Sequence, residues 1–300
     1  MRSLARLAYA AAVFAAMIAV CGSTAAAEFS AKDLAREEAK FAAYSVKNGM
    51  RAAFIEFFAE KSWLLRPEPV DAQAWIRGRP DPNIVLDWKS ARTVMSASHD
   101  LGFSTGPSIY RSKTDAYAPA AHGEFFSVWQ KQKSGEWKVL VDHGISHGPA
   151  ATPDTLPTDP LIALDLPAVK SMSVSGVARQ FASVRGAEIH FIAGNRTPYA
   201  DAITPRTRLL REGQMPIDGI AAIGDYLQSQ QGDWSWTVKL EGRSRANDMA
   251  YAVGNYTFQP KEGAAQKGQY VRVWVRAASD TDAPRWTLAA EVLTPEPVKK

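Results

Sequence analysis

Asp142 and His143 are neighbours near the end of an expected strand over 137–145, and they are the sequence's best candidates for acid–base chemistry. Successive side chains of a strand point to opposite faces, so His143 and Asp142 are expected on opposite sides of the sheet. Lys138 shares the face of Asp142, which indicates that this face is the wetter one. We therefore expect His143 to point inward, where a neutral imidazole could act as a general base. Asp142 is the alternative candidate for that role.

No metal site and no cofactor are expected. His147 follows His143 by four residues, but Gly144 lies between them and no helix would bring the two imidazoles together. A third ligand, which such a site would need, is not evident in the sequence. The chain also lacks a Ser/His/Asp pattern and a glycine-rich loop that could hold a phosphate.

Aromatic side chains form a second candidate site. Trp88, Trp129 and Trp137 could wall a pocket for a small planar or apolar ligand. Tyr44, on an expected helix, and His143 could complete that pocket. The alternative interpretation is that the tryptophans only fill the interior of the fold.

The same aromatic and glycine residues return later in the chain at an offset of 145 to 149 residues. The matching segments are Trp88 with Trp236, Asp100-x-x-Phe103-x-x-Gly106 with Asp248-x-x-Tyr251-x-x-Gly254, Gly123…Trp129 with Gly268…Trp274, and Trp137 with Trp286. Because their order never changes, the pattern predicts two tandem copies of one domain.

The repeat also bears on the candidate catalytic residues. The His-Asp pair at 99–100 becomes Asn-Asp at 247–248, and such a pair between two alternating runs is typical of a turn. His143 becomes Val292, so the fold does not need a histidine at that place. A half-exposed histidine near a strand end is the structural alternative for His143.

A proline-rich stretch separates the two copies. It contains Pro149, Pro153, Pro157, Pro160 and Pro167. Proline fixes φ and removes an N–H donor, so this composition predicts a semi-rigid linker over 148–167. The two domains are then expected at 28–147 and 168–297.

Each copy is expected to place its helices before its strands, which is the α+β pattern. Ser30 and Asp33 resemble a capping box, and helical spacing then connects Leu34, Glu38, Phe41 and Ser45. An apolar stripe over 50–58 and a short run over 71–77 predict two further helices.

Alternating patterns predict the strands of both copies. In the first copy we expect strands near 86–97, 101–110, 123–133 and 137–145. In the second copy we expect them near 234–245, 249–258, 268–277 and 285–293, after a poorly marked helix whose apolar trace is Val177, Phe181 and Val184.

The first 27 residues have the pattern of a secretory signal peptide. Two arginines precede an apolar run, and small residues up to Ala27 predict cleavage before Glu28. Cys21 raises a lipoprotein alternative, but Val20 stands before it where a small residue is expected. A periplasmic or secreted protein without disulfides follows, because Cys21 is the sole cysteine.

Charge and hydropathy exclude some classes of partner. The formal net charge is +4, without a cluster of Lys and Arg of the kind that binds nucleic acid. Apart from the first 27 residues, no apolar segment is long enough to cross a membrane. The sequence therefore predicts neither a nucleic-acid partner nor a membrane span.

Several of these motifs resemble one family of secreted bacterial domains of unknown function. They are Trp88, Asp100-Leu101-Gly102-Phe103-x-Thr105-Gly106-Pro107, Gly123…Trp129 and Trp137-Lys138-Val139-x-x-Asp142. That family belongs to the nuclear transport factor 2-like superfamily, which includes polyketide cyclases and ketosteroid isomerase. The resemblance implies two cone-shaped α+β domains, each a curved antiparallel sheet packed on N-terminal helices, with a pocket at the wide end.

Such folds host enzymes and non-enzymes alike, so the resemblance implies no particular reaction. We expect an exported protein that binds a small apolar or aromatic ligand in the first cone. The alternatives are an isomerase, cyclase or hydrolase that uses His143 or Asp142, and a structural protein of the envelope. The sheet faces could also pair, within one chain or between two chains.

Overall fold

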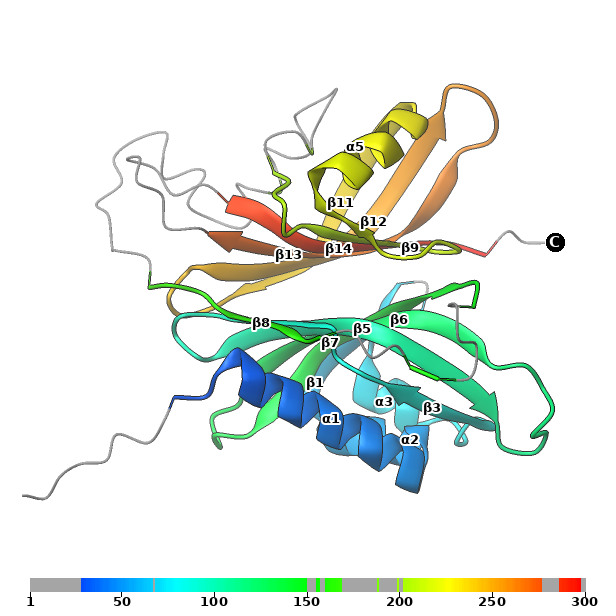
Figure 1. Cartoon of the computed structure of the whole chain (residues 1–300), viewed down its shortest axis with the longest axis vertical. Helices are drawn as coiled ribbons and strands as arrows, with labels where there is room; N and C mark the ends of the chain where they lie inside the picture. Colours follow the sequence, from blue (N-terminus) through cyan, green and yellow to red (C-terminus); the bar gives the residue numbers. More distant parts are fainter. Residues whose placement is uncertain are drawn as a thin grey trace, which may run out of the picture.

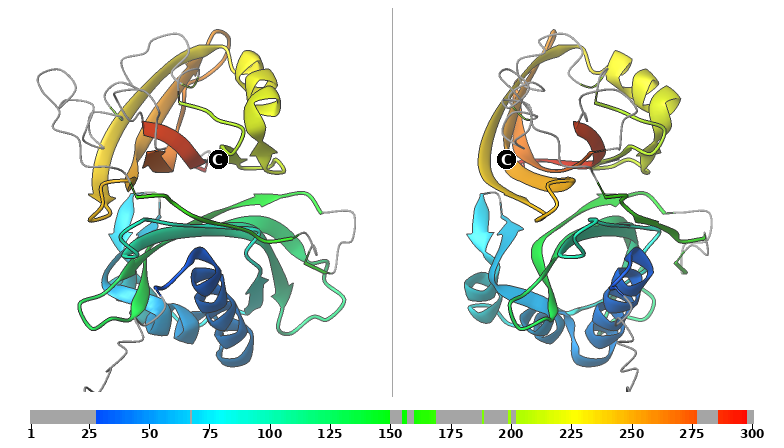
Figure 2. Two further views of the ribbon diagram at one scale, coloured as in Figure 1. Left: turned by 60° about the vertical axis from the view of Figure 1, so that its left-hand side comes forward. Right: turned by 90° about the vertical axis from the view of Figure 1, so that its left-hand side faces the viewer.

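Two separate β-sheets pack face to face, and helices cover their outer sides (Figures 1 and 2). The computed structural model describes residues 28–66, 68–149, 155–156, 160–168, 188, 199, 202–276 and 286–297. The predicted signal peptide with Cys21, and the predicted helix trace at Val177, Phe181 and Val184, lie outside the described residues. None of the helices in the described ranges has both the length and the apolar character that a bilayer crossing requires.

Three helices cover the first sheet: α1 (Ala31–Asn48), α2 (Met50–Phe57) and α3 (Ala72–Arg77). Ser30 and Asp33 form the predicted capping box at the start of α1. Gly49, with a φ of 91°, ends α1 and starts α2, because glycine adopts this left-handed backbone without strain. Asp71 caps α3, and the helix ends at Gly78 as expected.

The first sheet has the strand order β2-β1-β7-β6-β5-β4-β8, and β3 also pairs with β5. Its strands are β1 (Phe58–Leu65), β2 (Pro69–Asp71), β3 (Ile84–Trp88), β4 (Arg92–Met95), β5 (Leu101–Ser112), β6 (Ala121–Lys131), β7 (Trp137–His147) and β8 (Ile162–Asp165). β1 runs parallel to β7, so the sheet is mixed rather than wholly antiparallel.

The second sheet repeats this order as β10-β9-β14-β13-β12-β11, and β9 runs parallel to β14 as β1 does to β7. Its strands are β9 (Arg208–Arg211), β10 (Ile217–Asp218), β11 (Gly232–Arg243), β12 (Met249–Pro260), β13 (Gln266–Arg276) and β14 (Trp286–Pro295). One helix, α5 (Gly219–Ser229), accompanies it in the described ranges. Trp88 pairs with Ser108, and Trp236 pairs with Tyr256, at matching places in the two sheets.

Most predicted strands agree with the structure to within two residues at each end. The strand predicted over 86–97 is instead two strands, β3 and β4. The regular pairing with β5 is interrupted at Ser90, between the N–H groups of Lys89 and Ala91, which bond to Pro107 and Thr105. Part of the predicted linker also joins the first sheet, since β8 pairs in parallel with β4. The domain boundaries stay a prediction.

A bulge in β7 changes the face of the sheet to which the side chains after Leu140 point. Val128 pairs with Val141 and Trp129 pairs with Val139, so Leu140 is an extra residue on β7. An extra residue shifts the two-residue alternation by one position. Val139 therefore packs inside the first domain, whereas Val141 packs against the second sheet.

The surface between the two sheets is one continuous apolar core. The first sheet contributes Val94, Phe103, Phe126, Val128, Val141 and Ile145, and the second contributes Leu210, Val253, Val271, Val273, Ala290 and Val292. Their burial is the main force that holds the halves together, at about 25 cal/mol per Å² of apolar surface.

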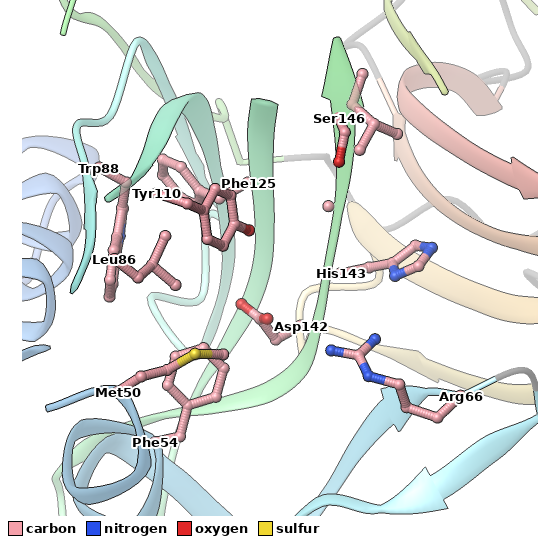
Figure 3. Close-up of a pocket in the computed structure, with 12 residues that line it drawn as sticks. Met50, Phe54, Arg66, Leu86, Trp88, Tyr110, Phe125, Asp142, His143 and Ser146 are labelled. Carbon is pink, nitrogen blue, oxygen red and sulfur yellow. The ribbon is translucent and has the colours of Figure 1, made fainter. Parts of the chain in front are cut away.

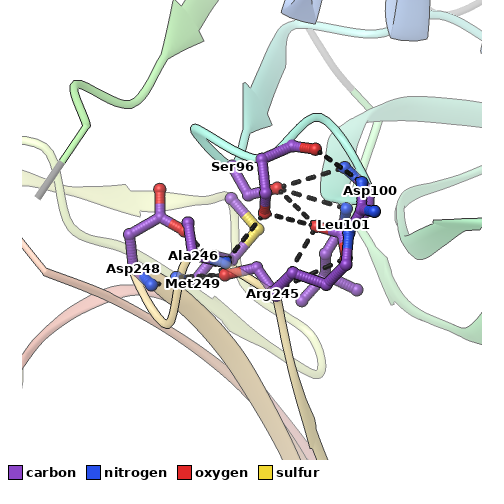
Figure 4. Close-up of polar contacts among 9 residues, drawn as sticks. Ser96, Asp100, Leu101, Arg245, Ala246, Asp248 and Met249 are labelled. Atoms are coloured by element: carbon purple, nitrogen blue, oxygen red, sulfur yellow. Dashed lines mark hydrogen bonds and ion pairs between the residues drawn. The ribbon is translucent and has the colours of Figure 1, made fainter.

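Two hairpin turns fasten one end of this interface by exchanging equivalent bonds (Figure 4). Asp248 accepts a hydrogen bond from the backbone N–H of Ala97, and Asp100 accepts one from the backbone N–H of Arg245. The two turns are the ones predicted from Asn-Asp chemistry, and His99 and Asn247 have φ values of 48° and 56°. Each aspartate thus closes its own turn and binds the partner turn.

We expect Asp248→Ala to destabilise the protein by about 1–3 kcal/mol, because the N–H of Ala97 loses its acceptor at a buried carboxylate. Urea unfolding measures this loss. The control is Arg245→Ala, whose side chain is 75% exposed in its ion pair with Asp100 and should contribute less than about 1 kcal/mol. If both variants lost the same free energy of unfolding, the hydrogen bond from Ala97 to Asp248 would not contribute to stability as we expect.

Candidate functional site

A cavity of about 120 Å³ opens inside the first domain, between the helices and the strands (Figure 3). Its apolar walls are Met50 and Phe54 from α2, Leu86 and Trp88 from β3, and Phe125 from β6. Its polar lining residues are Asp142, His143, Tyr110, Ser146 and Arg66. Arg66 and Ser146 are exposed, so the cavity reaches solvent on their side.

Asp142 is the carboxyl group of this cavity. Its side chain points toward Met50 and Trp88, and its Oδ2 accepts a hydrogen bond of 2.9 Å from the hydroxyl of Ser127 (Figure 3). Burial raises the pKa of Asp142 to about 7, and the charge of nearby Glu38 adds to the rise, although the Ser127 hydrogen bond opposes it. This carboxyl can therefore hold or release a proton near neutral pH.

Glu38 lies deeper in the same interior and joins α1 to three strands. Its carboxyl accepts hydrogen bonds from the indole N–H groups of Trp88 and Trp129, each 2.7 Å long, and from the hydroxyl of Ser104. Glu38 is 1% exposed, and its burial raises its pKa even though all three donors favour the charged form.

Our sequence analysis did not identify Glu38 as a site residue, although a signal was present. Glu38 falls within the apolar stripe of its helix, between Leu34 and Phe41. A carboxyl on a buried helix face requires hydrogen-bond donors in the interior, and tryptophan side chains supply them here.

His143 is among the residues that line the cavity, but its imidazole does not point into the cavity as we expected. It lies 7% exposed between the two sheets, where its Nε2 shares a hydrogen bond of 2.6 Å with the hydroxyl of Thr294. Figure 3 shows His143 and Asp142 on opposite sides of β7. The assignment of the two faces was wrong because the bulge at Leu140 reverses the alternation before both residues. Burial and the charge of Arg66 lower the pKa of His143 to about 3, so it is neutral.

The remaining predicted pocket residues are only partly brought together. Trp88 lines the cavity. Trp129 does not line it but is fully buried and donates its indole N–H to Glu38. Trp137 belongs to the same core cluster but stacks on Phe29, and Tyr44 packs on Phe57 rather than lining the cavity.

His147 is the last residue of β7 and lies beside an acidic side chain of β6. Its Nε2 lies 3.9 Å from the carboxylate of Glu124, which raises the pKa of His147. Glu124 in turn binds Arg208 of the second sheet at 3.1 Å. The described residues contain no group of three or more His, Cys, Asp or Glu side chains arranged to hold a metal ion.

The second half holds two buried carboxylates at the corresponding places. Glu188 accepts hydrogen bonds from the indole of Trp274 at 2.6 Å and from Arg272 at 2.9 Å. Glu291 accepts from Arg272 at 2.5 Å and from Arg211 at 2.5 Å. Burial would raise the pKa of Glu291, but the charges of Arg211 and Arg272 outweigh it and hold that pKa below its usual value.

Strand register relates the two halves residue by residue. Arg272 pairs with Glu291 across β13 and β14, and Ser127 pairs with Asp142 across β6 and β7. By the same registers, Tyr270 corresponds to Phe125, Trp274 to Trp129, Trp236 to Trp88 and Val292 to His143. The arginine between the two carboxylates of the second half is thus a serine in the first half.

Comparison with solved structures gives similarity over about two fifths of the chain. A ketosteroid isomerase-like protein from Erwinia carotovora is 16% identical, with a TM-score of 0.32 over 39% of this chain and 95% of that one. A conserved protein from Planctomyces limnophilus is 17% identical, with a TM-score of 0.29 over 38% and 94%. Nuclear transport factor 2 from Cryptosporidium parvum is 12% identical, with a TM-score of 0.30 over 42% and 100%.

Similarity at these TM-scores carries no argument about the function of this chain. No protein-family model matches the sequence, and the curated proteins contain no match either. The chemistry of the site therefore has to be argued from its own residues.

We expect His143→Val to make stability less dependent on pH. In the wild type the unfolded chain takes up a proton on His143 below about pH 6.5, whereas the folded chain does not until about pH 3. Stability is therefore lost as pH falls, by about 2 kcal/mol between pH 7 and pH 5. Urea unfolding at both values should show this loss in the wild type and a smaller loss in the variant.

Asp142→Asn is the matched comparison on the other face of β7. The folded-state pKa of Asp142 lies above its unfolded value, so its contribution to stability is lost as pH rises toward 7. The asparagine variant should therefore gain stability over the wild type at pH 8 and not at pH 4. The placement of both side chains would be contradicted if His143→Val changed stability mainly at pH 8 and Asp142→Asn mainly at pH 4.

Proposed function

We propose that this protein binds a small ligand in the cavity of its first domain and that the second domain is a diverged copy with a supporting role. The observation that carries the proposal is a cavity with aromatic and aliphatic walls and one convergent carboxyl group, Asp142. Such a combination is typical of small-molecule sites, where apolar walls supply affinity and a few polar groups fix orientation.

The size of the cavity limits the ligand. A volume of about 120 Å³ is near the roughly 150 Å³ that holds a benzene ring in a protein interior. Because the side of Arg66 and Ser146 reaches solvent, a longer ligand could extend past that edge. The matching strand order of the two sheets and the corresponding tryptophans support the interpretation as tandem nuclear transport factor 2-like domains.

We also propose that the protein acts outside the cytoplasm after removal of residues 1–27. The charged start, the apolar run and the small residues before Glu28 support this. N-terminal sequencing of the mature chain should begin at Glu28, and an acylated Cys21 at the N-terminus would contradict it.

Phenol is a suitable probe of the cavity, because it is ring-sized and can donate a hydrogen bond to Asp142. We expect binding with a Kd of about 1 mM or tighter by ligand-observed NMR, equivalent to about −4 kcal/mol. Met50→Trp should fill the cavity and weaken binding at least about tenfold while the protein stays folded.

Met215→Trp is the matched control for Met50→Trp, since it makes the same change at a methionine that is 52% exposed. It should leave phenol binding unchanged. Absence of phenol binding to the wild type, or equal loss in both variants, would contradict a ligand site in the first domain.

Acid–base catalysis by Asp142 is a second candidate function, because this carboxyl lines the cavity with its pKa raised to about 7. As a general base it would take a proton from a carbon next to a carbonyl group and return one to the product. Acetone fits the cavity, and its exchange of hydrogen for deuterium in D₂O reports this step by NMR.

We expect the wild type to speed the exchange of acetone by at least about tenfold over Asp142→Asn, with a rate that rises through about pH 7 as the carboxyl ionises. His143→Val serves as the control and should exchange acetone like the wild type. Equal rates in wild type and Asp142→Asn would leave binding as the function of the cavity.

A further inference from the structure

In the second half of the chain, the guanidinium group of Arg272 lies at the place that corresponds to the cavity of the first half. Arg272 is fully buried, and it binds Glu188 at 2.9 Å and Glu291 at 2.5 Å. Its guanidinium carbon lies 3.9 Å from the ring centre of Trp236 and 4.2 Å from that of Tyr270. Two carboxylates and two aromatic faces therefore surround one cation.

The first half keeps the surroundings of that cation but not the cation itself. Trp88, Phe125 and Asp142 correspond to Trp236, Tyr270 and Glu291, and all three line the cavity. Glu38 binds Trp129 as Glu188 binds Trp274.

Ser127 occupies the position of Arg272, and its short side chain reaches only as far as Asp142. No salt bridge to Asp142 or Glu38 is present among the residues that the structure describes.

We propose that the cavity of the first domain binds a guanidinium or amidinium group of a small ligand, at the place that Arg272 fills in the second domain. This inference rests on the proposed function of that cavity and names its ligand class. The ligand's planar cation would lie against Trp88 and Phe125 and donate hydrogen bonds to Asp142. Its charge would offset the two acidic groups, Asp142 and Glu38, that the first half leaves without a buried arginine.

Proton release should accompany this binding. The cation binds the ionised carboxyl of Asp142, whose pKa in the empty cavity is raised to about 7. The fraction of protein that can bind therefore grows with pH through about 7 and levels off above about pH 8. Affinity for a cation should increase about tenfold from pH 6 to pH 8, whereas affinity for a neutral ligand should not.

Arg66 is the cation of this chain that could compete for the place. It corresponds to Arg211, which binds Glu291 directly in the second half. Arg66 is exposed instead, lies 5.3 Å from the ring centre of Trp75, and donates to the carbonyl of Leu65. Arg66 lines the cavity and its charge lowers the pKa of Asp142, but the two side chains form no salt bridge in the described structure. Arg66→Ala should therefore strengthen or preserve cation binding.

Methylguanidinium and N-methylurea are the probes, because they have nearly the same shape and differ in charge. Titration of the full mature chain, followed by calorimetry at pH 8, should give at least about tenfold tighter binding of methylguanidinium. Ser127→Arg rebuilds the internal cation of the second domain and should abolish binding of methylguanidinium. Ser127→Ala keeps the cavity open and should retain it.

Asp142→Asn keeps the inference testable if Ser127→Arg fails to fold. It preserves the size of the cavity and should lose the preference for methylguanidinium while phenol still binds. Equal affinities for the two probes in the wild type, with phenol bound, would overturn the ligand class and leave the proposed function intact. Binding of neither phenol nor methylguanidinium would overturn both, and cation binding that survives Asp142→Asn would overturn the assignment to this cavity.

Discussion

Each half of this protein depends on a buried carboxylate, Glu38 in the first half and Glu188 in the second, that accepts hydrogen bonds from side chains of its sheet. A buried carboxylate is costly unless donors surround it, so the elements that carry the donors must stay in register with it. In the first half Glu38 fixes α1 against β3, β5 and β6 through Trp88, Ser104 and Trp129. Because β3 and β6 also form walls of the cavity, the same bonds that satisfy Glu38 set the width of the site.

The two halves stabilise their pairs of buried acidic side chains in different ways. The second half neutralises its acidic pair internally, with Arg272 between Glu188 and Glu291 and Arg211 on the far side. The first half satisfies Glu38 with neutral donors and leaves Asp142 with one hydroxyl partner, Ser127. One residue position, serine in one sheet and arginine in the other, decides whether a buried guanidinium group lies between the two acidic side chains.

The interface between the sheets explains how the two halves can differ in this way. Their large apolar contact and the exchange between the two turns at Asp100 and Asp248 hold the second sheet against the first without involving either interior. The imidazole of His143 points into this interface, where it bonds Thr294, and its counterpart Val292 belongs to the apolar cluster between the sheets. Substitutions inside one domain can thus change its pocket while the pairing of the sheets persists.

The sequence by itself determined the long strands β5 to β7 and β11 to β14, the capping box at Ser30 and the turns at 99–100 and 247–248, because these features follow from local periodicity and short-range hydrogen bonding. It also identified Trp88 and Asp142 as site candidates. Only the tertiary structure decided which face of β7 each residue takes, since the bulge at Leu140 arises from pairing with β6 and leaves no mark in the alternation. The role of Glu38, the addition of β8 to the first sheet and the place of Arg272 were likewise decided by contacts between segments far apart in the chain. Such contacts are set by the partners that burial brings together, which a local pattern does not specify.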